Sequence, residues 1–267
     1  MKNYFTQFLK GILSYKEAIV FLFNNKLMYF FIFPILFNFF LSSLVFYFLE
    51  MGSDYLHDYV LFLINSMLGN VVLNGGIISK VISISLWIFS KIFFLFLFLT
   101  FSGYITILIL SPIFTFLSEK IAAIKNGYNY SFNLLQFFKD IFRAVVIAIR
   151  NIFIQFILLL LFFLLGFVPV IGWAISMFGN IVVASYFYGF SFIDFSNERN
   201  KLTVKESVNF VRKKCGIAIG IGLVFYVCLL IPLAGSFLAS LLSIISLAAA
   251  TLCVEEMNIN SINPQSF

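Results

Sequence analysis

The sequence contains few charged residues. Asp, Glu, Lys and Arg make up 10% of the 267 residues, whereas 62% are apolar and the mean hydropathy is +1.07. A soluble domain of this length needs many more charged side chains to cover its surface. A lipid-facing surface is itself apolar, so this shortage excludes a water-soluble fold and predicts an integral membrane protein whose main partner is the lipid bilayer.

Histidine and cysteine are also scarce. His57 is the only histidine, and the three cysteines, Cys215, Cys228 and Cys253, show no CxxC spacing. Metal sites need clusters of such ligands, and nucleophilic catalysis needs a base beside the nucleophile. The sequence therefore predicts neither an enzyme nor a bound metal or cofactor.

The basic residues, which outnumber the acidic ones, are concentrated in the segments between the apolar runs. Lys and Arg number 17 against 11 Asp and Glu, and the basic residues stand in short segments beside apolar runs. This distribution is typical of the positive-inside rule, so we expect no nucleic-acid partner. Applying the rule to every loop places 15 of the 17 basic residues, and both termini, in the cytoplasm.

The first 26 residues have the pattern of an amphipathic helix. In residues 2–17, apolar side chains recur at helical spacing opposite a polar face that carries three lysines. No uninterrupted apolar core with a cleavage site follows, as a signal peptide would require. We expect residues 1–26 to form an interfacial helix on the cytoplasmic side.

Long uncharged runs predict two long spanning helices. Residues 27–49 contain no charge, and residues 81–118 contain only Lys91 and are expected to form one long helix. Pro34 is a candidate kink in the first run. The acidic stretch 50–58 is expected outside the cytoplasm, and residues 59–79 are expected not to cross, although a span remains an alternative.

Two further uncharged runs each contain a central break. Residues 151–193 are interrupted near Pro169, and residues 215–254 near Pro232, which predicts two helical hairpins. Basic loops precede each hairpin, at 119–150 and 199–214. The expected fold is all-α, a polytopic membrane protein with about six membrane segments in one domain, 27–256, followed by a polar tail, 257–267. Whether the hairpins cross fully or re-enter stays open.

Isolated polar residues within these runs are the candidate functional residues. Lys80 and Lys91 are 11 residues apart, on nearly the same helical face, and either line an anion path or, for Lys91, snorkel to the interface. Asn38 is expected to bond another helix. Glu119 is expected to pin helices together through a basic partner such as Lys120 or Lys125.

Five short segments resemble the CysZ sulfate-permease family, within the wider etoposide-induced-protein superfamily. They occur in the family's order, and they are 33–38 (FPILFN), 111–119 (SPIFTFLSE), 167–172 (FVPVIG), 193–203 (IDF followed by Arg199, Leu202 and Thr203) and 231–233 (IPL). Asp194 and Arg199 match the family's loop, where they form either a structural clasp or part of a cytoplasmic mouth.

The resemblance implies uptake of sulfate, a small inorganic anion, by a homo-oligomer in the bacterial inner membrane. The chain departs from the family where paired arginines precede the first-span proline and are implicated in sulfate contact. Met28 and Tyr29 stand there, and the nearest cation is Lys26. The candidate anion path is therefore Lys26, Lys80 and Lys91, and the alternative is a non-transporting membrane-organising or accessory protein of the same superfamily.

Overall fold

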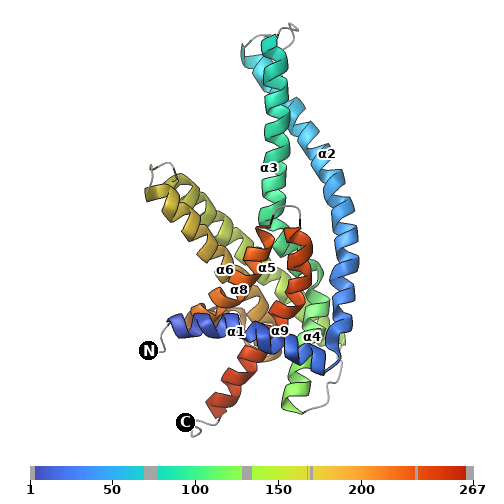
Figure 1. Ribbon diagram of the computed structural model, residues 1–267, viewed down its shortest axis with the longest axis vertical. Helices are drawn as coiled ribbons and strands as arrows, with labels where there is room; N and C mark the ends of the chain where they lie inside the picture. Colours follow the sequence, from blue (N-terminus) through green and yellow to red (C-terminus); the bar gives the residue numbers. More distant parts are fainter. Residues whose placement is uncertain are drawn as a thin grey trace. The chain divides into compact units, whose positions relative to one another are not determined.

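The computed structural model describes residues 4–68, 77–127, 134–166, 168, 171–231 and 234–262, and every element in these ranges is a helix (Figure 1). The predicted all-α fold is confirmed. The helices are α1 (Tyr4–Asn24), the 3-10 helix η1 (Leu27–Phe31), α2 (Ile32–Leu68), α3 (Ile77–Ile109), α4 (Ser111–Asn126), α5 (Leu134–Leu165), α6 (Ile171–Arg199), α7 (Val204–Lys213), α8 (Cys215–Leu229) and α9 (Gly235–Ile262).

The chain divides into two compact units. Unit 1 comprises Met1–Ile35 and Gly103–Phe267, and unit 2 comprises Leu36–Ser102. Within unit 2, two polar contacts join α2 to α3. Lys91 Nζ lies 3.7 Å from Asp54 Oδ1, and His57 Nε2 lies 3.2 Å from Ser83 Oγ. The predicted limits of the interfacial helix and the polar tail remain predictions.

Several helices are long and apolar enough to cross a membrane. Among the described residues, three segments qualify by length and composition: Phe142–Phe162, Ile171–Arg199 and Phe237–Met257. Two bent helix pairs, Tyr4–Asn24 with Leu27–Asn38 and Gly103–Ile109 with Ser111–Asn126, raise the number to five if each pair is one span. The chain is therefore a multi-pass helical membrane protein.

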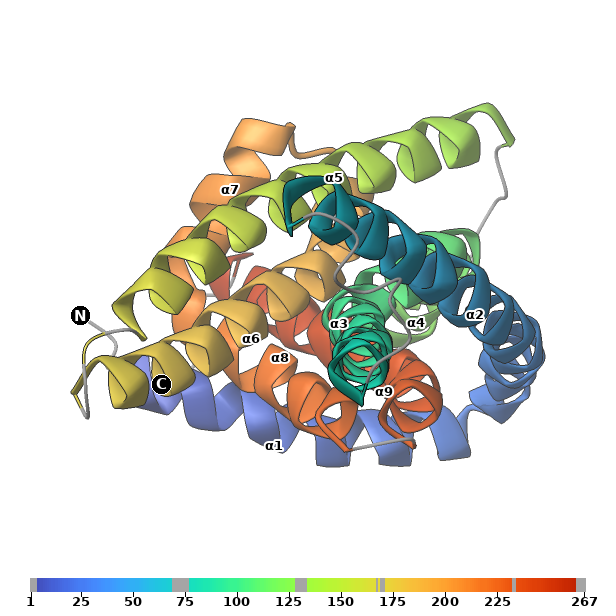
Figure 2. The same cartoon turned by 90° about the horizontal axis from the view of Figure 1, so that it is seen from above.

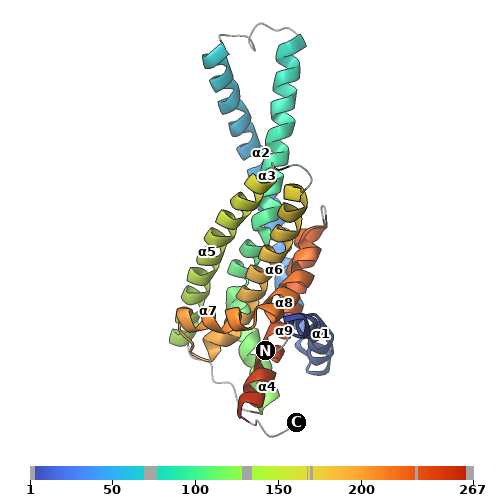
Figure 3. The same ribbon diagram turned by 90° about the vertical axis from the view of Figure 1, so that its left-hand side faces the viewer.

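Both predicted hairpins are present in unit 1. Helices α5 and α6 run side by side and join near residue 168, and α8 joins α9 near residue 231 (Figures 2 and 3). The helices extend past the uncharged runs, since α5 begins at Leu134 and α6 reaches Arg199. An uncharged run shows which part of a helix can lie in lipid, but the helix itself can continue into charged residues on either side.

Glycines allow α6 to cross α8 in backbone contact. A Cβ atom on Gly189 would lie 1.8 Å from the carbonyl oxygen of Ala218, and one on Gly222 would lie 1.8 Å from that of Ser185. Only residues without a side chain permit this approach. The crossing holds the two hairpins together.

The prediction of one long helix over residues 81–118 is wrong. Helix α3 ends at Ile109, α4 begins at Ser111, and the last part of α3, Gly103–Ile109, is bent by 69° from Ser111–Asn126. Pro112 lies in the first turn of α4. A proline lacks the N–H of the helical ladder and its ring clashes with the preceding turn, so the chain begins a new helix there.

Two other expectations concern the region before α3. Pro34 lies in the first turn of α2, directly after η1, so the chain changes helix type just before it. Residues 59–68 continue α2, and residues 69–76 lie outside the described part of the chain. Whether residues 59–79 cross remains a prediction.

Helix α1 packs on the rest of unit 1 through one face and leaves several large apolar side chains outside this face uncovered. Gly11, Tyr15 and Ala18 are buried, and the Tyr15 hydroxyl lies 2.7 Å from the Ile221 carbonyl oxygen and donates to it. Phe5 and Leu13 are 63% and 62% exposed. A bare apolar face on a helix beside membrane segments is typical of an interfacial helix, so this supports the predicted lipid contact.

Candidate functional site

The three lysines of the predicted anion path belong to different units. Lys26 is exposed between α1 and η1 in unit 1, whereas Lys80 and Lys91 lie on α3 in unit 2. Lys80 is exposed. Lys91 pairs with Asp54 and lies 5.4 Å from the centre of the Trp87 ring. The path through these three lysines therefore stays a prediction.

Asn38 and Glu119 both lie within helices. Asn38 is buried in α2, and Glu119 is half-buried in α4. The two lysines expected near Glu119 make other contacts, since Lys120 Nζ donates to the Tyr29 hydroxyl at 2.8 Å and Lys125 Nζ lies 3.6 Å from Glu256 Oε1. The roles of Asn38 and Glu119 stay predictions.

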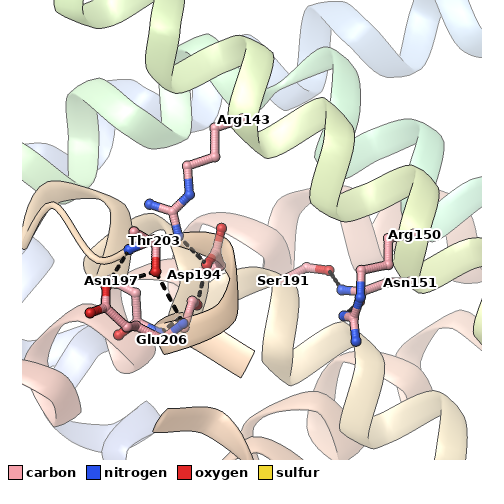
Figure 4. Close-up of polar contacts among 9 residues, drawn as sticks. Arg143, Arg150, Asn151, Ser191, Asp194, Asn197, Thr203 and Glu206 are labelled. Atoms are coloured by element: carbon pink, nitrogen blue, oxygen red, sulfur yellow. Dashed lines mark hydrogen bonds and ion pairs between the residues drawn. The ribbon is translucent and has the colours of Figure 1, made fainter. Parts of the chain in front are cut away.

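Asp194 is held by two other helices near the C-terminal end of α6 (Figure 4). Arg143 Nη2, on α5, donates to Asp194 Oδ1 at 3.1 Å, and the Ser207 hydroxyl, on α7, donates to the same oxygen. Asn197 Nδ2 donates to Ser207 Oγ at 2.9 Å. Asp194 is 3% exposed, so these donors replace water around a buried carboxylate.

Helix α7 is placed for this contact by its own N-terminal cap. The Glu206 backbone N–H donates to Thr203 Oγ1 at 3.3 Å, and the Thr203 backbone N–H donates to Glu206 Oε2 at 2.8 Å. Such a reciprocal capping box satisfies helix donors that otherwise lack partners. It begins α7 directly after α6 and so presents Ser207 to Asp194.

Arg199 forms a second buried ion pair one turn further along α6. Its guanidinium donates to Glu255 Oε1 on α9 and, at 2.9 and 2.7 Å, to the backbone carbonyl and hydroxyl oxygens of Ser118 on α4. Asn126 Nδ2 donates to the other Glu255 oxygen at 2.6 Å. Arg199 therefore joins α4, α6 and α9.

Asp194 and Arg199 thus each bind a different partner. We call the residues Arg143, Asp194, Arg199 and Glu255 the charged clasp. Because its contacts link α4, α5, α6 and α9, they fit the structural-clasp interpretation, and the cytoplasmic mouth stays a prediction. Arg143 and Glu255 could not be predicted as functional residues, because the sequence shows each of them only as a charge beside an apolar run.

A line of polar side chains continues from the clasp between α5 and α6. Asn151 Nδ2, on α5, lies 3.4 Å from Ser191 Oγ, on α6. One turn further along α5, Gln155 Oε1 accepts a hydrogen bond from the hydroxyl of Tyr104, which stands on α3. All four side chains are buried. We call Arg143, Asn151, Ser191, Gln155 and Tyr104 the α5–α6 polar line.

The polar line retains hydrogen-bond donors for a ligand. Arg143 Nε is buried and has no hydrogen-bond partner among the described residues. Amide, hydroxyl and guanidinium groups supply several N–H and O–H donors along the line. Such groups suit an anion better than a cation.

Metal-ligating groups do not gather in the described ranges. No set of three or more His, Cys, Asp or Glu side chains there lies close enough to hold a metal ion. Cys215, Cys228 and Cys253 are free thiols in or beside helices α8 and α9.

Comparison with known proteins gives a family. No curated protein matches the chain significantly. The family model described as "Sulfate transporter CysZ/Etoposide-induced protein 2.4" matches residues 14–240, a range that contains all five segments singled out in the sequence. The predicted resemblance is confirmed, and the chain belongs to the sulfate transporter CysZ/etoposide-induced protein 2.4 family.

Proposed function

We propose that this protein moves a small oxyanion, such as sulfate, across the inner membrane of a bacterium. Membership in a family described by a sulfate transporter supports the proposal. The observation that carries it is the α5–α6 polar line, which begins at a partly buried arginine whose buried Nε–H group has no hydrogen-bond partner among the described residues. Ionisable groups within membrane segments are costly and usually serve function.

The polar line has the chemistry that an oxyanion needs. Arg143 carries the positive charge, and the side-chain amides of Asn151 and Gln155 add neutral N–H groups. The Ser191 hydroxyl accepts from Asn151 and donates to the Phe187 carbonyl oxygen, and the Gln155 oxygen accepts from the Tyr104 hydroxyl. Neutral donors bind an anion weakly enough to release it, whereas a row of arginines would retain it. In this proposal Lys26, Lys80 and Lys91 attract the anion at the surface and do not hold it within the bundle.

Uptake of radiolabelled sulfate into proteoliposomes tests the proposal. The parent protein should accumulate sulfate above empty vesicles, and Asn151→Leu or Gln155→Leu should reduce the rate by about tenfold, the factor for one lost hydrogen bond of about 1.4 kcal/mol. Asn209→Leu, on the exposed face of α7, is the matched control. Lys26→Ala and Lys91→Ala should reduce uptake mainly at low salt.

The alternative is a non-transporting accessory protein. Two observations favour it: the clasp charges are paired with each other, and Met28 and Tyr29 replace the arginines expected before Pro34. Folded protein that gives no sulfate uptake above empty vesicles would contradict transport and support this alternative. A homo-oligomer is expected under both functions, and chemical cross-linking in membranes measures it.

A further inference from the structure

One face of helix α7 carries three exposed basic side chains. Lys205, Arg212 and Lys213 are exposed, whereas Ser207 and Val211 are buried. In an α-helix, Lys205 and Arg212 lie about 20° apart around the axis, and Lys213 lies about 80° from Lys205. The two buried side chains project from the opposite side of the helix. We call Lys205, Arg212 and Lys213 the α7 basic face.

The positive charge of this face is not neutralised by an ion pair. In the described part of the chain, none of its three side chains pairs with a carboxylate. The one acidic residue of α7, Glu206, accepts hydrogen bonds from the backbone N–H and the hydroxyl group of Thr203 at the start of the helix. Its carboxylate therefore belongs to the N-terminal cap. The face keeps a surplus of positive charge that an external partner can neutralise.

Two features indicate that α7 lies at the surface of the membrane. Lys214 ends α7 and is followed at once by α8, whose 15 residues contain no charge. In Figure 3, α7 lies across the end of α6 near the level of α1, the helix with the bare apolar side chains. Basic residues directly before a membrane helix are typical of the level of lipid headgroups.

The inner side of α7 is fixed to the bundle. The Ser207 hydroxyl donates to Asp194 Oδ1 and accepts from Asn197 Nδ2 at 2.9 Å, and Val211 is buried. These contacts keep the α7 basic face directed away from α6. Cations that are already held in one array lose less conformational freedom on binding than cations on a flexible loop.

We propose that the α7 basic face binds the headgroups of anionic phospholipids, such as phosphatidylglycerol, in the membrane leaflet beside α7. Ammonium and guanidinium groups donate N–H bonds to phosphate oxygens, and each cation near an anionic lipid surface strengthens association by about fivefold. A soluble acidic protein would be attracted by the same charge. Lipid is favoured because the apolar helix α8 begins directly after Lys214. This surface is separate from the α5–α6 polar line.

The composition of the lipid beside α7 tests the proposal without any transport measurement. In a chain whose native cysteines are replaced by serine, Asn209→Cys carries a fluorophore, because Asn209 is exposed at the centre of the face. The full chain is placed in phosphatidylcholine nanodiscs that contain a small fraction of quencher lipid, spin-labelled on its acyl chain. The quencher is either phosphatidylglycerol or phosphatidylcholine, and the ratio of the two quenching constants measures the preference for the anionic headgroup.

The variants are Lys205→Gln, Arg212→Gln, Lys213→Gln and the combination of all three. Lys80→Gln is the matched control, since it removes an equal exposed charge on α3. Melting temperatures in nanodiscs of phosphatidylcholine alone show whether each variant keeps the stability of the parent. They should match the parent, because the three side chains form no ion pair within the described chain.

The parent should prefer phosphatidylglycerol by at least about fivefold at low salt, and each single substitution should reduce this preference by about fivefold or to its loss. The triple variant should quench equally with both lipids, Lys80→Gln should match the parent, and 1 M salt should weaken the parent's preference. Equal quenching of the folded parent by both lipids would overturn the proposal and leave the face to a soluble acidic partner. An equal loss in Lys80→Gln, or lower melting temperatures of all three single variants in phosphatidylcholine, would also overturn it.

Discussion

Asp194 shows what burial does to the strength of an ion pair. Its side chain is 4% exposed beside Arg143, whereas Asp54, in unit 2, is 62% exposed beside Lys91. Water solvates the exposed carboxylate in the folded and the unfolded chain alike, so that pair contributes little. The buried carboxylate depends on its protein partners, because removal of one partner leaves the other charge without solvent.

Asp194→Asn should therefore destabilise the protein far more than Asp54→Asn. We expect a loss of about 3–5 kcal/mol for the buried position and about 0–1 kcal/mol for the exposed one. The measurement is the apparent melting temperature in detergent for both variants beside the parent. Equal shifts for the two variants would show that Arg143 does not depend on Asp194.

Glu206 gives a pH dependence with a definite sign. The backbone N–H of Thr203, followed by its hydroxyl, donates to the Glu206 carboxylate and holds its pKa below the ordinary value of 4.5. The unfolded chain therefore takes up a proton at higher pH than the folded chain does. The stabilisation by the cap is complete above the unfolded pKa and is lost as the pH falls through the folded pKa.

The difference in melting temperature between the parent and Glu206→Gln should therefore become smaller at low pH. The parent should melt at a higher temperature at pH 7, and the gap should close below about pH 4.5, because a protonated carboxyl accepts hydrogen bonds no better than an amide. Melting temperatures across this pH range measure the effect, and Lys205→Gln, outside the cap, serves as the control. A gap independent of pH would mean that the charge of Glu206 plays no part in the cap.

At the scale of helices, each hairpin has one arm whose uncharged part is shorter than the hydrocarbon core of a membrane. Only 15 residues separate Arg150 from the end of α5 at Leu165, and α8 also has 15 residues. At 1.5 Å per residue each arm reaches about 22 Å, less than the roughly 30 Å of a hydrocarbon core. We therefore predict that the hairpin tips stop inside the membrane if the lipid-embedded part of α5 begins at Arg150, whereas the longer segment Phe142–Phe162 would reach across.

Cysteine accessibility at the tip measures this depth. In a chain whose native cysteines are replaced by serine, Trp173→Cys should resist membrane-impermeant thiol reagents from both sides of intact vesicles. Lys201→Cys, in the basic loop after α6, should react from the cytoplasmic side. Labelling of residue 173 from the outer side alone would show that the hairpin crosses completely.

At the scale of the whole molecule, the first and the last helix contact each other, so we expect both ends of the chain on the same side of the membrane. Lys10 Nζ on α1 lies 2.8 Å from Glu256 Oε2 on α9, so the first and last helices meet (Figure 1). Because 15 of the 17 basic residues belong to loops assigned to that side, the positive-inside rule predicts that it is cytoplasmic.

Reporter fusions test this orientation. A fluorescent protein fused after residue 267 should fluoresce, because it folds in the cytoplasm, and a periplasm-dependent phosphatase fused there should be inactive. The phosphatase fused within residues 69–76, between α2 and α3, should be active. The opposite pattern would invert the topology, and equal activity of both reporters at one site would indicate two orientations.

The sequence predicted a membrane protein because the free energy of moving a segment into lipid is approximately the sum of the contributions of its own side chains. The uncharged runs 151–193 and 215–254 and their central breaks predicted the two hairpins, and five short segments predicted the family. The same summation missed the bend before Pro112, since hydropathy does not register how a proline ring meets the preceding turn.

The partners of the buried charges depend on how distant helices pack. Asp194 and Arg199 are five residues apart, yet Asp194 meets Arg143, 51 residues away, and Arg199 meets Glu255, 56 residues away. The packing of α5 and α9 against α6 brings these pairs together. The sequence shows that a charged side chain needs a partner if it is buried. Which side chain becomes that partner depends on how the helices pack.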